Sequence, residues 1–285
     1  MKYVFFGSPR FAEIILGKFL DAGLEPAALV CNPDRPVGRK KVLTPPATKA
    51  LLAARAPHVP VFQPEKPAGV AAELARIAPD IAIVAAYASI IPDAVLAIPK
   101  RGTVGIHPSL LPNYRGASPI QTALLNGERE TGVSVYLMDA KMDHGPVIAD
   151  ETWPIADNEQ YPQLEEELAY VGAALAIDAI PKFLAGELEP RAQDEAAATF
   201  TRKFTTQDGF VDEADLMEAE RGDVKRADLI LRTVNALTPE PGAWTMRAGK
   251  RTKLLAAEIE DGALRLTRIQ EEGGLPKTVG RSPSR

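Results

Sequence analysis

The chain of 285 residues contains one cysteine, Cys31, so no pair of thiols is available for an internal disulfide. This scarcity favours a reducing compartment. The first residues also lack the long apolar stretch and the cleavage site of a secretory signal peptide. No run approaches the roughly 20 apolar residues that a membrane span needs. The sequence therefore predicts a cytoplasmic protein with no membrane partner.

An excess of positive charge is missing as well. The formal net charge is -5, so the whole chain is not an obvious nucleic-acid binder, although a local basic patch could still bind RNA. The spacing of the three histidines is not that of a metal site, and no metal is expected. The segment GSPRF, at residues 7–11, follows the first apolar run but lacks the glycine pattern that admits a dinucleotide. A nicotinamide cofactor is therefore not expected.

The first half of the chain alternates between short apolar runs and stretches with helical spacing. Continuous apolar strands separated by helices are typical of a parallel sheet that is covered on both faces. The sequence thus predicts an α/β domain with a doubly wound, mostly parallel sheet. The predicted strands are 3–6, 27–30, 59–62, 81–85, 103–106, 132–137 and 147–153, and the predicted helices are 11–20, 70–77, 118–125 and 160–184.

The composition changes after a polar stretch without clear periodicity that begins at residue 188. Beyond it we expect one helix, a break at Pro239-Glu240-Pro241-Gly242 and a group of short strands. We therefore predict a first domain over 1–187, a linker over 188–202 and a small β-rich, barrel-like domain over 203–285 that ends in a mobile tail. The expected helix is 223–237, and the expected strands are 243–246, 252–259 and 263–269.

His107 is the leading candidate for chemistry, because it directly follows a predicted strand and ligands bind at the carboxyl ends of parallel strands. Imidazole donates or accepts a proton near neutrality. Asp143 lies in the turn between two later strands, and a carboxylate beside a histidine stabilises its charged form and fixes its orientation. Taken by themselves, a histidine of this kind is more often a capping or core residue, and an aspartate in a turn is very common.

Two further groups of residues carry positive charge. The segment DRPVGRKK, residues 34–41, has four basic side chains and reads as a loop, which suits a phosphate backbone but also an ordinary solvated loop. Arg115 could hold a carboxylate or phosphate, or could form a structural ion pair.

The run HPSLLPNYRGASPIQTALLNGERETGVSVYLMDAKMDHGPVIA resembles the core of the folate-dependent formyltransferase family. The resemblance covers nearly the whole chain, through VFFGSPRFA, NPDRPVGRKKVLTPP, FQPEK, APDIAIVAAYASIIP and NALTPEPGAW. The basic loop and the C-terminal domain favour the members that act on tRNA. The resemblance implies that a formyl group passes from 10-formyltetrahydrofolate to the amino group of methionyl initiator tRNA.

The resemblance also implies roles for particular residues. The family's catalytic histidine and aspartate correspond to His107 and Asp143, and its C-terminal domain would be an OB-like barrel. We further expect a monomer. The expected folate contacts are Ser109, Leu110, Leu111, Pro112, Ala86, Tyr87 and Ile90, and the expected tRNA contacts are Arg35, Arg39, Lys40 and Lys41.

One residue departs from the family pattern. The family usually has asparagine two residues before the catalytic histidine, where this chain has Gly105. A water could occupy the vacated space, another donor could reach in, or catalysis could be weakened. Two alternatives to an active tRNA-formylating enzyme therefore stay open: formyl transfer to another amine, such as an amino-sugar nucleotide, and an inactive folate- or RNA-binding relative.

Overall fold

The computed structural model describes residues 1–38 and 40–279, which form two compact units. The first unit combines Met1–Gly116, Gly132–Trp153 and Glu165–Phe200. The second combines Ala117–Thr131, Pro154–Leu164 and the chain from Thr201 onward. Each unit is assembled from several segments, whereas the sequence predicted continuous domains over 1–187 and 203–285 with a linker over 188–202. That division stays a prediction.

A seven-stranded sheet organises the first unit, in the order β10-β9-β7-β6-β1-β2-β5. The pairs β2–β5, β1–β2, β1–β6 and β6–β7 are parallel, and β9 runs antiparallel to β7. The predicted doubly wound, mostly parallel sheet is confirmed. The strands are β1 (Tyr3–Phe6), β2 (Ala28–Val30), β5 (Val61–Phe62), β6 (Ile81–Ala85), β7 (Thr103–His107), β9 (Glu130–Leu137) and β10 (Val147–Pro154).

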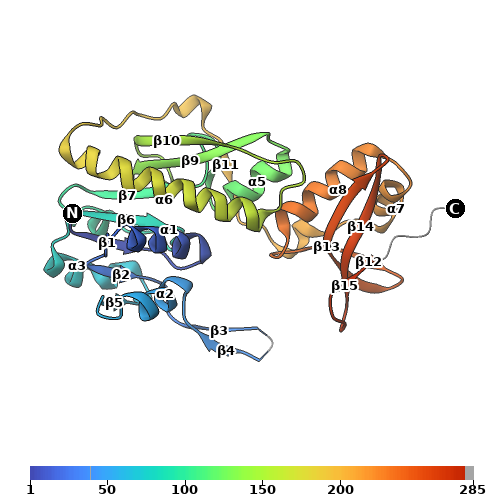
Figure 1. Ribbon diagram of the computed structural model, residues 1–285, viewed down its shortest axis with the longest axis horizontal. Helices are drawn as coiled ribbons and strands as arrows, with labels where there is room; N and C mark the ends of the chain where they lie inside the picture. The colour runs from blue at the N-terminus through green and yellow to red at the C-terminus, as the bar shows by residue number, and fades with distance from the viewer. Residues whose placement is uncertain (39, 280–285) are drawn as a thin grey trace. The chain divides into compact units, whose positions relative to one another are not determined.

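Helices cover both faces of this sheet. Side chains alternate between the faces along each strand, so a strand that is apolar throughout places apolar side chains on both faces. On one face the Tyr3 ring contacts Phe19, with ring centroids 5.6 Å apart. Val4 points to the other face and shares a buried cluster with Leu74. Figure 1 shows α1 and α6 lying across the front of the sheet. The helices are α1 (Arg10–Asp21), α2 (Ala47–Arg55), α3 (Ala71–Ile77), α4 (Asp93–Leu96) and α6 (Tyr161–Ala185), and a 3-10 turn, Pro67–Val70, precedes α3.

Helix α6 is long and apolar enough to cross a membrane by length and composition alone. The sequence predicted this helix over 160–184, but not that its length and composition would suit a membrane span. One face of the helix packs inside the protein, however, since Leu168, Ala176 and Ile180 are buried. Gly172 lies so close to the sheet that a Cβ there would be 2.9 Å from the side chain of Ile106. We therefore interpret α6 as a core helix.

The second unit has an antiparallel sheet in the order β12-β13-β14-β15. Helix α8 begins where the Asp223 carboxylate accepts hydrogen bonds from the backbone of Lys225 and Arg226. Its buried face joins Leu254 and Leu264 in one apolar cluster. The expected β-rich C-terminal region is confirmed: within the described residues it is a four-stranded antiparallel sheet covered by helices. The closure of such strands into an OB-like barrel stays a prediction. The elements are α5 (Pro119–Asn126), α7 (Glu213–Glu220), α8 (Val224–Leu237), β12 (Ala243–Arg247), β13 (Lys250–Glu260), β14 (Ala263–Glu271), β15 (Lys277–Thr278) and a 3-10 turn, Thr206–Gly209.

The basic segment after β2 is a two-stranded hairpin and not the predicted loop. Strands β3 (Arg35–Val37) and β4 (Val42–Thr44) pair antiparallel, and Figure 1 shows the hairpin extending away from the sheet. At its base Asp34 is tied to Lys49 by an ion pair of 2.8 Å. All described residues of β3 and β4 are exposed.

Candidate active site

The ends of three neighbouring parallel strands create the edge at which the candidate site lies. The register pairs Phe6 with Val84 and Ala85 with Ile106. The residues that follow, Ala86 and His107, therefore emerge side by side at the carboxyl end of the sheet. This is the edge where open α/β sheets bind their ligands. The predicted position of His107 is thus confirmed.

His107 is nearly buried, with 7% of its surface exposed, and both ring nitrogens face oxygen atoms. Nε2 lies 3.0 Å from the carbonyl oxygen of Tyr114. A carbonyl accepts and never donates, so Nε2 carries the hydrogen in this contact. Nδ1 faces Asp143 Oδ2 at 3.7 Å, which is too long for a hydrogen bond and within range of a charge interaction. The imidazole is therefore held from one side and faces a carboxylate on the other.

Asp143 is held in position by hydrogen bonds to both of its carboxylate oxygens. Oδ2 accepts the backbone N–H of Gly116 at 2.7 Å, and Oδ1 accepts the hydroxyl of Tyr136 at 2.6 Å. The backbone of Asp143 has a φ of 50°, a left-handed conformation that aspartate tolerates better than most residues. The turn between β9 and β10 thus presents the carboxylate to His107, as the sequence predicted for this pair.

A buried arginine supports the same turn through Gln193. Arg115 is 1% exposed and binds the Glu195 carboxylate through two nitrogens, at 2.6 and 3.1 Å. It also donates to the side-chain oxygen of Gln193, whose amide in turn donates to the carbonyls of Asp143 and Gly145 at 2.9 and 2.7 Å. Of the two alternatives for Arg115, the structure shows the ion pair.

The sequence reasoning missed Gln193 and Glu195, which lie in the segment interpreted as a linker. That segment also forms a 3-10 turn, Glu195–Ala197, and a short strand, β11 (Phe200–Thr201), which pairs with β8 (Arg115–Gly116). Polar residues without periodicity gave no signal that they would turn back onto the site. Tyr136 was missed as well, because on sequence alone it looks like one apolar residue of a buried strand.

Gly145 is expected to be indispensable to this turn. A Cβ added there would lie 1.7 Å from the Leu137 carbonyl oxygen, so Gly145→Ala must displace backbone. We expect it to destabilise folding by about 1–3 kcal/mol and to lower activity by moving Asp143. Unfolding by urea and a steady-state assay measure the two effects. The matched control is Gly17→Ala on α1, where the nearest atom is 3.8 Å away; an equal loss in both variants would contradict the argument.

The predicted folate contacts gather near the same edge. Ser109–Pro112 follow His107 after one residue, and Ala86 stands beside His107 in register. The Ser109 hydroxyl is fully buried and donates to the Asn113 carbonyl at 2.6 Å, so it shapes the loop from within. Tyr87 is half-buried with its ring against Phe6, whereas Ile90 is 85% exposed. Contact of these residues with folate stays a prediction.

The side chains of the two other histidines pair with carboxylates other than Asp143. His144 Nδ1 is 2.6 Å from Asp139, and its Nε2 is 3.4 Å from Glu195. His58 is exposed on the surface beside Glu25. Over 1–38 and 40–279, no group of three or more His, Cys, Asp or Glu side chains is arranged to hold a metal ion.

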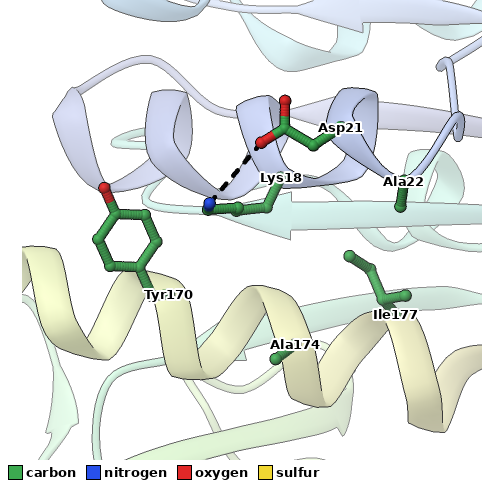
Figure 2. A pocket seen from close by; sticks show the side chains of 6 residues that line it. All are labelled: Lys18, Asp21, Ala22, Tyr170, Ala174 and Ile177. Atoms are coloured by element: carbon green, nitrogen blue, oxygen red, sulfur yellow. Dashed lines mark ion pairs between the residues drawn. The ribbon is translucent and has the colours of Figure 1, made fainter.

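A surface hollow between α1 and α6 is not part of this site. Figure 2 shows Lys18 between the ring of Tyr170 and the carboxylate of Asp21. The Lys18 Nζ atom is 3.7 Å from Asp21 and 4.8 Å from the centre of the Tyr170 ring. None of the predicted site residues lines this hollow, so we place the candidate active site at the strand ends.

This fold agrees with a comparison to known families. Residues 1–180 match the model of the family described as formyl transferase. Because the match covers more than half of the chain, the protein belongs to the formyl transferase family.

Two curated relatives narrow the comparison. A methionyl-tRNA formyltransferase of Halalkalibacterium halodurans is 40% identical over 90% of this chain and 78% of its own length. A methionyl-tRNA formyltransferase of Roseiflexus sp. (strain RS-1) is 42% identical over 91% of this chain and 77% of its own length.

Solved structures share the fold at lower identity. HypX from Aquifex aeolicus in complex with tetrahydrofolic acid is 20% identical with a TM-score of 0.68, and it aligns with 98% of this chain. This chain spans 46% of HypX, less than half of that protein. A 4-N formyltransferase from Francisella tularensis is 15% identical, also with a TM-score of 0.68, over 91% of this chain and 98% of its own.

Proposed function

We propose that the chain transfers the formyl group of 10-formyltetrahydrofolate to the amino group of methionyl initiator tRNA. The observation that carries this proposal is the identity of about 40% with methionyl-tRNA formyltransferases over about 90% of the chain. Formyl transfer to an amino-sugar nucleotide, the alternative left open by the sequence, is not favoured by relatives of that similarity.

Formyl transfer between nitrogen atoms requires stabilisation of one developing charge. The amine nitrogen attacks the formyl carbon, and the carbonyl oxygen becomes the oxyanion of a tetrahedral intermediate. An aligned hydrogen-bond donor stabilises such an oxygen most where water is excluded. His107 is nearly buried and lies at the ligand-binding edge of the sheet. Its Nε2–H is donated to the Tyr114 carbonyl, so we assign the stabilisation of the oxyanion to the Nδ1 side of the protonated imidazole.

The proton lost by the attacking amine must reach the departing folate nitrogen when the intermediate collapses. Asp143 carries a negative charge 3.7 Å from His107 Nδ1. In that position it supports positive charge on the ring and accepts a proton in transit. The transfer is then balanced: one C–N bond forms, another breaks, and one proton moves from the acceptor amine to the donor nitrogen.

We propose that the hairpin of β3 and β4 binds the phosphate backbone of the tRNA. Arg35, Lys40 and Lys41 are exposed on it, and Arg39 of the predicted set lies outside the described residues. Exposed basic side chains on an extended hairpin suit a polyanion, because each phosphate contact releases counterions. The residues 86–90 and 109–112 would contact the folate.

Replacing Arg35, Lys40 and Lys41 together by serine is expected to raise KM for tRNA about 10-fold or more while kcat changes little. Each lost phosphate contact should also lower the salt dependence of log KM by about one unit of slope. Steady-state kinetics at several salt concentrations measure both effects. The matched control places serine at Lys18, Lys100 and Lys182, which are surface lysines of other elements; the same rise there would contradict a specific role for the hairpin.

The deciding experiment is a formylation assay with the purified chain and 10-formyltetrahydrofolate. Methionyl initiator tRNA is offered as acceptor together with an amino-sugar nucleotide as rival. Formation of formyl-methionyl-tRNA supports the proposal, and transfer to the sugar amine alone replaces it by the alternative. Transfer to neither acceptor, with retained binding of folate or tRNA, supports a non-catalytic relative.

We also propose that the enzyme acts as a monomer in the cytoplasm, away from membranes. The buried stripe of α6 supports a position away from membranes, since Leu168, Ala176 and Ile180 pack inside the protein. Sedimentation velocity of the full chain checks the proposal, and a concentration-independent dimer would overturn the monomeric state.

A further inference from the structure

The side chain of Tyr136 occupies the space directly above Gly105. The two residues are partners in the antiparallel register between β7 and β9. A Cβ built on Gly105 would lie 2.4 and 2.6 Å from two carbon atoms of the Tyr136 ring and 2.9 Å from its hydroxyl oxygen. No real Cβ approaches a ring so closely. The glycine therefore leaves no vacated space, because the tyrosine fills it.

The ring of Tyr136 is fixed by its surroundings. The residue is 3% exposed and packs in a small apolar cluster with Leu111 and Val147. It cannot turn away from Gly105 without disrupting that cluster. Leu111 belongs to the loop that follows His107, so the same ring also supports the segment expected to contact folate.

The hydroxyl of Tyr136 contacts the Asp143 carboxylate. It donates to Asp143 Oδ1 at 2.6 Å, while Gly116 donates to Oδ2 at 2.7 Å. Two donors on two different oxygens fix the plane of the carboxylate, and Oδ2 is the atom that faces His107. Burial, and then the charge of Asp143, raise the pKa of Tyr136 well above its ordinary value, so the hydroxyl stays a donor throughout the neutral range.

We propose that Tyr136 is a positioning residue that takes the place of the asparagine that the family pattern implies at position 105, and that it holds Asp143 toward His107. This inference rests on the proposed formyl transfer. In this view a side chain from the neighbouring strand, Tyr136, supplies the support that Gly105 cannot give. The site then consists of His107, Asp143 and Tyr136, and Gly105 is the residue that makes room for the third member.

The first test is Tyr136→Phe, which keeps the ring above Gly105 and removes the hydroxyl. We expect kcat to fall about 10- to 100-fold, the effect of losing one hydrogen bond to a charged group, with KM for both substrates unchanged within about two-fold. The matched control is Tyr3→Phe on β1, which removes another buried hydroxyl, one that donates to the Leu24 carbonyl. It should lower stability without lowering kcat. A Tyr136→Phe enzyme with wild-type kcat overturns the proposal.

The second test introduces an asparagine at position 105 and removes the ring with which it would collide. Gly105→Asn alone should lose stability and activity, because its side chain collides with the buried ring. Tyr136→Leu alone should lose at least as much kcat as Tyr136→Phe. The double variant Gly105→Asn/Tyr136→Leu has room for the asparagine, and we expect it to recover at least about 10-fold in kcat over Tyr136→Leu. A double variant no more active than Tyr136→Leu contradicts the exchange.

Urea unfolding of the same variants separates this inference from the proposed function. The double variant should unfold at a higher urea concentration than is expected from adding the shifts of the two single variants. Likewise, Tyr136→Phe should cost less stability in an Asp143→Asn background than in the wild type. These couplings do not depend on the reaction. If the wild type transfers no formyl group but both couplings are present, the proposed function fails and the pairing stands; strictly additive shifts overturn the pairing itself.

Discussion

Replacement of His107 by asparagine is expected to lower kcat for formyl transfer by at least about 10²- to 10³-fold, the cost of removing one donor to an oxyanion. The asparagine amide is smaller than imidazole and cannot carry a positive charge. It could keep one hydrogen bond to the Tyr114 carbonyl, which His107 contacts at 3.0 Å, so the loop should stay folded. Substrate binding should change little, because the lost interaction forms in the transition state.

The measurement is steady-state kinetics with methionyl initiator tRNA and 10-formyltetrahydrofolate. The matched control is His58→Asn, the same substitution at an exposed histidine beside Glu25, which should leave kcat unchanged. His107→Asn with normal turnover would remove this residue from the active site, and a loss confined to KM would assign it to binding and not to the transition state.

Replacement of Asp143 by asparagine is the second change with a large expected effect, a loss of about 10²- to 10⁴-fold in kcat, the range typical of general acid–base groups. The shape of the side chain is retained. Its amide oxygen can accept from Gly116, and its NH₂ group can donate to the Tyr136 oxygen, which reverses that hydrogen bond. The negative charge that faces His107 at 3.7 Å is lost, so the activity should fall far more than the stability.

Urea unfolding and single-turnover kinetics test the two halves of this prediction. The control is Asp178→Asn, which removes a charge from an exposed pair with Lys182 on α6 and should affect neither quantity by much. A large loss of stability in Asp143→Asn with a proportionate loss of activity would show that the carboxylate holds the turn together and has no separate role in the chemistry.

Most of the fold could be predicted from local pattern. The runs at 3–6 and 81–85 coincide with β1 and β6, and the helix predicted over 223–237 is α8 with Asp223 as its cap. These elements follow from periodicity and capping, which act within a few residues. The hairpin of β3 and β4 does not follow from local pattern, because Pro36 and Gly38 are loop-forming residues and the strand that pairs with Arg35–Val37 lies across a turn.

Of the candidate site, His107 and Asp143 could be predicted from the sequence, whereas the residues that hold them in position could not. His107 and Asp143 stand at strand ends and match a known pattern, so position and residue type were enough. For Arg115 the sequence allows both a ligand contact and a structural ion pair. It does not show that Glu195, eighty residues later, comes within 2.6 Å of the guanidinium. An ion pair between residues so far apart in the sequence exists only once the fold brings their segments together.

The sequence by itself determined the family, the parallel sheet and the placement of His107 at a strand end, because these depend on local periodicity and on a contiguous motif. Only the tertiary structure decided what Gly105 means. In the sequence it is a missing donor; in the folded chain it is the space taken by Tyr136. The register between β7 and β9 places these two residues opposite each other, and the burial of the ring leaves its hydroxyl directed at Asp143.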